Sequence, residues 1–93
     1  MSGSILKMGA IVSTAVAEGR STILLAVRDT ALDPADSGWQ FTAGEFDPSL
    51  SESPQLWRIE EVLELEPSLA ALVNRAPGAR LMRSSKDADW TES

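Results

Sequence analysis

The chain has 93 residues, of which 43% are hydrophobic, so it has enough apolar surface for one small domain with a modest core. It contains no Cys and no His, which excludes disulfides, thiolate metal sites, Cys nucleophiles and His bases. The formal net charge of −6 disfavours nucleic acids and anionic membrane surfaces as partners, because both repel an acidic protein.

The acidic residues are concentrated in the middle of the sequence. Between residues 29 and 66 there are ten acids and one base, Arg58, so this window carries −9 and the rest of the chain +3. A surface with this charge attracts a basic protein partner. It also serves equally well as a solvated face that keeps a protein soluble.

The N-terminal stretch "MSGSILKMGAIVSTAVAEG" resembles a secretory signal, with Lys7 before a short apolar run. Polar residues at Ser13 and Thr14 interrupt that run, and its alternation fits a strand better, so we expect no cleaved signal. No apolar segment reaches the ~20 residues that a membrane span needs. We expect residues 1–8 to form a flexible tail.

The segment "GAIVSTAVAEGRSTILLAVRD" predicts two β-strands joined by a short turn at residues 18–20. Val and Ile favour strands, and Gly19 suits a turn position with positive φ. The run from Ile23 to Val27 is apolar on both faces. It therefore predicts an interior strand covered on both sides, although a short buried helix has the same pattern.

The segment "TALDPADSG" predicts a turn-rich link, and "WQFTA" after it alternates as a third strand with Trp39 and Phe41 on one face. A second acidic loop follows. From Leu56 onward, apolar residues recur at helical spacing, and Pro67 divides this region into two short helices.

The segment "APG" predicts the end of the second helix, and "ARLMRS" predicts a last strand. Residues 85–93 are polar apart from Trp90 and are expected to form a flexible tail. Together these elements predict a single α+β domain over residues 1–93. Its small antiparallel sheet has about four strands, with a pair of short helices packed on one face.

Chemical groups that could act on a substrate are few. Asp36 and Glu45 flank the aromatic strand and could form an acid–base pair if they converge in a cleft, but nothing in their spacing sets a distance. Asp33, Asp36 and Asp47 lack the spacing of a Ca²⁺-binding loop, so we predict no metal site and no cofactor.

Aromatic residues dominate both protein cores and interface hot spots. For Trp39 and Phe41 we expect the core, whereas Trp57, placed at the start of a predicted helix, suits either setting. Arg28 ends an apolar strand close to several acids, and we expect it to anchor a structural ion pair.

The block Asp36-Ser37-Gly38-Trp39-x-Phe41-x-x-Gly44-Glu45 resembles a bacterial family, the immunity protein 33-like domain. Further residues that fit this likeness are Val12-Ser13, Arg28-Asp29, Pro67 before an apolar helix, Pro77-Gly78-Ala79 and Trp90. The likeness spans roughly residues 10 to 90. It implies a place in polymorphic-toxin or type VI secretion neighbourhoods, where small cytoplasmic proteins bind and neutralise a cognate toxin.

These observations lead us to expect a non-catalytic toxin inhibitor that meets a possibly basic toxin through an acidic rim. The predicted partner-binding residues are Asp33, Asp36, Glu45, Asp47, Trp57 and Glu60. The predicted structural residues are Arg28, Gly38, Trp39, Phe41 and Gly44.

Two other functions remain open at this point. One is a small-ligand or peptide-binding accessory domain in which Trp39 and Trp57 line a pocket. The other is a hydrolase that works through Asp36 and Glu45. An exposed edge strand could also support a homodimer.

Overall fold

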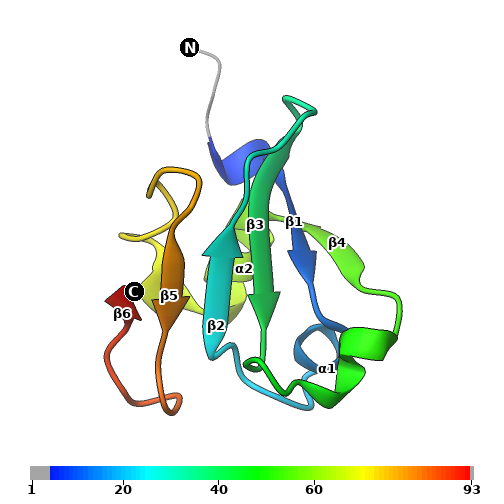
Figure 1. The fold of residues 1–93 in the computed structure, drawn as a ribbon, viewed down its shortest axis with the longest axis vertical. Helices are drawn as coiled ribbons and strands as arrows, with labels where there is room; N and C mark the ends of the chain where they lie inside the picture. Colours follow the sequence, from blue (N-terminus) through cyan, green and yellow to red (C-terminus); the bar gives the residue numbers. More distant parts are fainter. Residues whose placement is uncertain (1–4, 93) are drawn as a thin grey trace.

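The computed structural model describes residues 5–92 of the chain (Figure 1). Residues 1–4, which belong to the predicted N-terminal tail, and Ser93 lie outside this range. The first elements in chain order are the 3-10 helix η1 (Ile5–Lys7), strand β1 (Gly9–Val12), helix α1 (Thr14–Ala17) and strand β2 (Leu25–Arg28). Strand β3 (Asp36–Thr42) and the 3-10 helix η2 (Pro48–Ser51) follow.

The second half of the chain contains strand β4 (Gln55–Arg58), helix α2 (Ile59–Leu65) and the 3-10 helix η3 (Pro67–Leu69). Strands β5 (Arg80–Met82) and β6 (Thr91–Glu92) complete it, the latter inside the segment expected to be a tail. All strands join one six-stranded sheet in the order β4-β1-β3-β2-β5-β6. Figure 1 shows α2 behind this sheet and no helix in front of it.

The predicted α+β class is confirmed, but the predicted sheet of four antiparallel strands is wrong in two respects. The sheet has six strands, and β1 and β3 run parallel, with Ile11 paired to Gln40 and Val12 to Phe41. The other neighbouring strands run antiparallel. The sheet is therefore mixed.

The predicted hairpin between the first two strands is also wrong. Ser13 ends β1 as the N-cap of α1, where its hydroxyl accepts a hydrogen bond from the Val16 amide, so residues 14–17 form one helical turn. Gly19 does take a positive φ of 76° in the turn that follows. Strand β3 then lies between β1 and β2, which places β2 inside the sheet as expected, but with helices on one face only.

The helix predicted to begin near Leu56 begins instead at Ile59, because the preceding residues pair with β1 as strand β4. The Arg58 amide donates to the Glu61 carboxylate at 2.8 Å, which closes the first turn of α2. The break at Pro67 is confirmed, since α2 ends at Leu65 and η3 starts at Pro67. The strand predicted within "ARLMRS" is confirmed as β5.

The core lies between the sheet and α2. From β3 it contains Trp39 and Phe41, which are stacked with ring centroids 5.7 Å apart, as the alternation of this strand predicts. Ile59 and Val62 of α2 and Leu69 of η3 pack against the same cluster. Burial of each large side chain contributes about 2 kcal/mol to folding. Among residues 5–92, no helix combines the length and apolar character required to cross a membrane.

Candidate partner-binding surface

The aromatic residues of the Asp36–Glu45 block are structural. Trp39 is only 1% exposed, and its indole N–H donates to the Val73 carbonyl at 2.8 Å. This bond ties β3 to the turns that follow η3. Because the indole is both buried and hydrogen-bonded, Trp39 cannot form the wall of a ligand pocket without unfolding its surroundings.

Gly38 and Gly44 both take backbone conformations that disfavour side chains, with φ of 83° and 120°. Gly38 also lies against the neighbouring β2–β3 link: a Cβ added there would sit 1.9 Å from the Asp29 carbonyl oxygen. Around Gly44 the same atom would meet nothing within 4 Å. Gly38 therefore permits a close approach of two backbone segments, and Gly44 permits the turn after β3.

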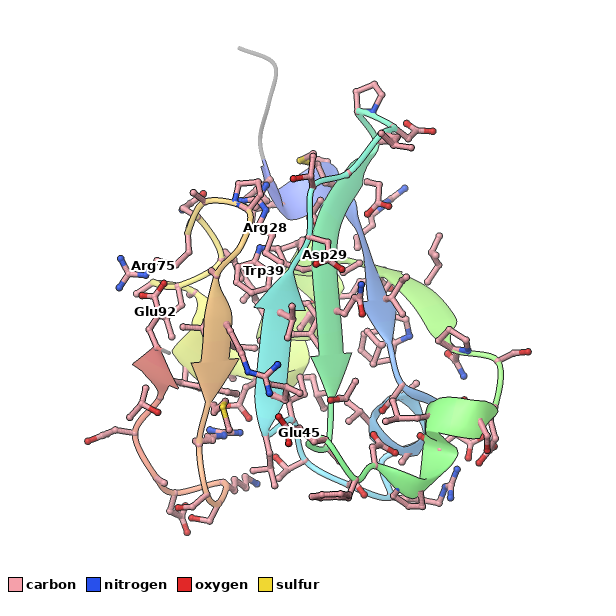
Figure 2. The ribbon with its side chains drawn as sticks, viewed as in Figure 1. Arg28, Asp29, Trp39, Glu45, Arg75 and Glu92 are labelled. Atoms are coloured by element: carbon pink, nitrogen blue, oxygen red, sulfur yellow. The ribbon has the colours of Figure 1, made fainter. Side chains whose placement is uncertain are left out.

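Arg28 is a structural anchor, but the ion pair expected for it is wrong. Its Nε donates to the Ser37 carbonyl at 2.9 Å and its Nη1 to the Arg75 carbonyl at 2.7 Å. Within residues 5–92, no carboxylate lies within ion-pair distance of its guanidinium. Arg28 thus joins β2, β3 and the loop before β5, beside the Trp39 ring (Figure 2).

Asp33 and Asp36 are both exposed and lie close in sequence at the start of β3. Asp33 Oδ1 accepts from the Ala35 amide at 2.8 Å, and Asp36 Oδ1 accepts from the Gly38 amide at 2.9 Å. Both side chains line a hollow of about 260 Å³ together with Ile11 and Leu56. These two carboxylates are therefore held in place and accessible.

Glu45 lies beyond the other end of β3 (Figure 2) and is exposed. It forms an ion pair with Arg80 of β5. Since β3 has seven residues, Asp36 and Glu45 are separated by roughly 20 Å of extended strand. They do not converge as an acid–base pair. Among residues 5–92 there is also no cluster of carboxylates able to hold a metal ion.

Asp47 does not lie on the exposed rim that the sequence predicts; it is 5% exposed. Its carboxylate accepts hydrogen bonds from the Ser13 hydroxyl at 2.6 Å, the Ala43 amide at 2.9 Å and both the amide and hydroxyl of Ser49. Burial alone would raise the pKa of Asp47, but these hydrogen bonds outweigh burial and lower the pKa to about 2. Asp47 joins α1 to the loop after β3 and is not available to a partner.

Trp57 and Glu60 lie apart from the Asp33–Asp36 pair. Trp57 belongs to β4, half-buried on the core face of the sheet, and its indole N–H donates to the Gln55 side chain at 3.2 Å. Glu60, on α2, pairs with Lys7 at 3.2 Å and lies 3.7 Å from Arg58. Of the six predicted partner-binding residues, the structure thus brings together Asp33 and Asp36.

Sequence reasoning missed a buried ion pair that joins α2 to the end of β5. Arg83 donates to the Glu66 carboxylate at 2.7 Å and stacks over Trp90, with 4.4 Å to the ring centroid. Burial would raise the pKa of Glu66, but the hydrogen bond from Arg83 outweighs it, so the pKa is lowered. The sequence did contain a sign that Arg83 is buried. Arg83 follows the buried Leu81 by two residues, and alternate residues of a strand share a face.

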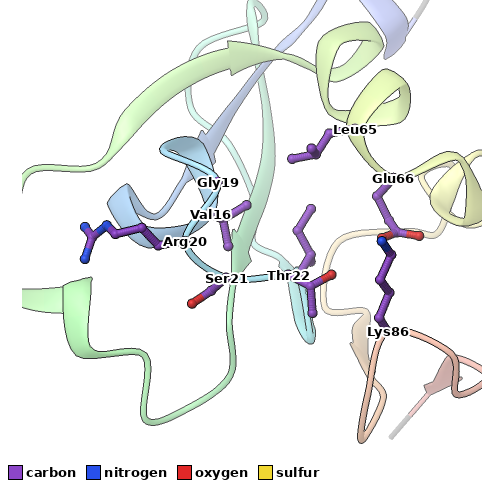
Figure 3. A pocket seen from close by; sticks show the side chains of 9 residues that line it. Val16, Gly19, Arg20, Ser21, Thr22, Leu65, Glu66 and Lys86 are labelled. Carbon is purple, nitrogen blue, oxygen red and sulfur yellow. The ribbon is translucent and has the colours of Figure 1, made fainter.

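A hollow of about 300 Å³ adjoins this ion pair (Figure 3). Figure 3 shows Glu66 and Lys86 directed toward one another across it, and Arg20 directed away. The Glu66 carboxylate is already bound by Arg83, and Arg20 is paired with Glu18 at 3.0 Å. Two of the three charged groups around this hollow are therefore already paired.

Comparison with known proteins gives one match. The family model described as the immunity protein Imm33 domain matches residues 10–93. No curated protein and no solved structure matches the chain. The match covers the Asp36–Glu45 block and nearly all the elements described above.

Proposed function

Because the chain belongs to the immunity protein Imm33 domain family, we propose that it binds and neutralises a cognate bacterial toxin without catalysing a reaction itself. The observation that carries this proposal is the family match, which extends over residues 10–93. The family resemblance inferred from the Asp36–Glu45 block is thereby confirmed.

Charge supports a basic surface on the proposed toxin. The chain has a net charge of −6, and its sequence window from 29 to 66 carries −9. Asp33, Asp36 and Glu45 lie exposed on the protein within this window. Complementary charge accelerates encounter and selects against wrong partners, which suits an inhibitor that must act before the toxin does.

The proposed setting is the cytoplasm of a bacterium that makes polymorphic or type VI-secreted toxins, as the family resemblance implies. Strands β4 and β6 are the two edges of the sheet, and either could pair with a second copy of the chain. A homodimer is therefore a subsidiary proposal, which a solution mass measurement on the purified protein decides.

The test is to express each protein encoded by the neighbouring genes, under an inducible promoter, in a bacterial host with or without this chain, and to identify one that arrests growth as the toxin. We expect the chain to restore growth and to copurify with the toxin. The matched control is an unrelated acidic protein of similar size and charge, which should give neither result. Toxin arrest that persists in the presence of soluble, folded chain would contradict the proposal.

In the part of the chain that the structure describes, the geometry favours neither of the two other functions considered from the sequence. Trp39 and Trp57 are packed in or against the core, and neither lines the hollows described here. Asp36 and Glu45 lie at opposite ends of β3. Toxin neutralisation is accordingly the function we propose.

A further inference from the structure

One face of the sheet is covered by α2 and the other is open (Figure 1). Alternation along each strand assigns the side chains that project from the open face. Strand β1 contributes Gly9 and Ile11, and its antiparallel neighbour β4 contributes Leu56, the register partner of Ile11. Leu56 is 79% exposed. Leu50, which is 54% exposed, lines a hollow with Ile11, so several accessible apolar side chains lie near one another along β1. Contiguous exposed apolar side chains are typical of a surface that a partner covers.

Two hollows lie along β1 on this open face, with volumes of about 260 and 240 Å³, and both include Ile11 in their walls. Because they share this residue, we treat them together as the β1 groove. Gly9 contributes no side chain, which leaves space above β1 at that position. The remaining walls of this β1 groove come from β3, β4 and the segments next to them: Asp33, Ala35, Asp36, Gln40, Thr42, Ser49, Leu50, Glu52, Pro54 and Leu56.

The walls of the β1 groove combine apolar side chains with negative charge. Asp33 and Asp36 lie at one end and Glu52 lines the other, and none of the lining residues is basic. Two bases lie close to the ends of the groove. Arg20 is 3.9 Å from Glu52 and is also paired with Glu18, and Arg58, the register partner of Gly9, is 3.7 Å from Glu60. Within residues 5–92, Asp33 and Asp36 form no ion pair. Asp33 and Asp36 use Oδ1 for the backbone amides described above. Within residues 5–92, the Oδ2 of each accepts no hydrogen bond and so stays available to a partner.

We infer that the β1 groove is the surface on which the toxin docks, an inference that rests on the proposed function. The occupant that fits is a protein surface carrying Lys or Arg beside apolar side chains. The aliphatic stem of such a base would cover Ile11 and Leu56, and its charge would lie near Asp33 and Asp36. The apolar contact supplies affinity, and the carboxylates supply orientation and rate.

A second copy of this chain is a poorer occupant of the same groove. Two grooves facing each other across a two-fold axis would bring Asp33, Asp36 and Glu52 of both copies together, and like charges at close range oppose association. Charge complementarity therefore selects a basic partner over self-association at this face.

The first experiment measures the affinity of purified variants for the toxin identified in the growth test above. Leu56→Ser should weaken binding roughly 30-fold, the loss typical of an interface hot spot. Asp33→Asn/Asp36→Asn keeps both backbone hydrogen bonds but removes two charges; it should weaken binding about 5-fold and reduce its salt dependence.

Matched controls change residues that do not line the β1 groove. Leu65→Ser removes a leucine that is 48% exposed at the end of α2. Glu64→Gln/Asp89→Asn removes two exposed charges outside the β1 groove. Both controls should bind the toxin within about 2-fold of wild type, because they lie outside the proposed interface.

The second experiment uses the absence of native Cys. Leu56→Cys and Leu65→Cys each provide a single thiol, and the rate of its reaction with a maleimide reports its accessibility. Saturating toxin should slow the reaction of Leu56→Cys about 10-fold and leave Leu65→Cys nearly unchanged, since an interface core excludes solvent. Suppose that the wild-type chain binds the toxin, that the groove variants bind it with undiminished affinity, and that the toxin does not protect Leu56→Cys. These results would overturn the inference about the groove and leave the proposed function standing. Absence of wild-type binding would overturn the proposed function and the groove with it.

Discussion

At the scale of single residues, the loop after β3 is held by one buried carboxylate. The Asp47 carboxylate accepts hydrogen bonds from the hydroxyls of both Ser13 and Ser49. Through these two bonds it connects α1 to η2. A buried carboxylate with several donors is stable only while it is ionised. The residue that the sequence suggested as a contact for the toxin is thus part of the framework.

The pH dependence of stability should show this role. A carboxyl with a lower pKa in the folded state contributes stability above its unfolded pKa, near 3.8, and loses it as the pH falls toward about 2. Glu66 adds an effect of the same sign. We expect Asp47→Asn to lower the free energy of unfolding at neutral pH by roughly 2 kcal/mol and to flatten its fall between pH 4 and pH 2.

Urea unfolding followed by tryptophan fluorescence at a series of pH values measures this change. Asp33→Asn removes the same charge at an exposed site and should leave stability at neutral pH almost unchanged. A pH profile of Asp47→Asn that runs parallel to wild type would show that the carboxylate is not the source of the acid sensitivity.

The two glycines of the Asp36–Glu45 block allow a matched comparison. Gly44→Ala faces only the strain of positive φ and should cost about 1 kcal/mol. Gly38→Ala meets the same strain and a backbone carbonyl that cannot move away, so we expect a loss of more than about 3 kcal/mol. Thermal unfolding of both variants ranks the two costs, and equal costs would contradict the close approach at Gly38.

At the scale of secondary structure elements, the boundary between β4 and α2 shows what a pattern can and cannot predict. Leu56, Ile59 and Leu63 do recur at helical spacing, but β1 offers an unpaired edge to residues 55–58. Hydrogen bonds across that edge convert the start of the predicted helix into a strand. A pairing partner of this kind lies nearly fifty residues away in sequence, so the periodicity of a short segment cannot reveal it.

The start of α2 can be tested directly. Glu61→Ala removes the acceptor of the Arg58 amide and should lower the free energy of unfolding by about 1 kcal/mol. Glu64→Ala, an exposed change on the same helix, is the control and should cost only a few tenths of a kcal/mol. Chemical denaturation curves compare the two, and an equal loss would exclude a capping role for Glu61.

At the scale of the whole molecule, the elements were more predictable than their arrangement. Alternation in "WQFT" correctly placed Trp39 and Phe41 on the buried face of a strand, and Pro67 correctly divided the helical region. The parallel pairing of β1 with β3 has no local signature, because it depends on the path of the chain through α1 and β2. The sequence also could not predict which acids are exposed. Asp36 and Asp47 both stand in loop-like acidic segments, but packing leaves Asp36 exposed and buries Asp47.

The placement of β1 also has a consequence for how the protein acquires its structure during synthesis. Gly9 pairs with Asp36 on one side and with Arg58 on the other, so the first strand to be made waits for partners far along the chain. Loop closure of this length slows folding relative to a fold built from local hairpins. If synthesis stopped early, the N-terminal fragment would expose β1 as an unpaired, apolar strand. The chain should therefore fold cooperatively only after β4 has emerged from the ribosome.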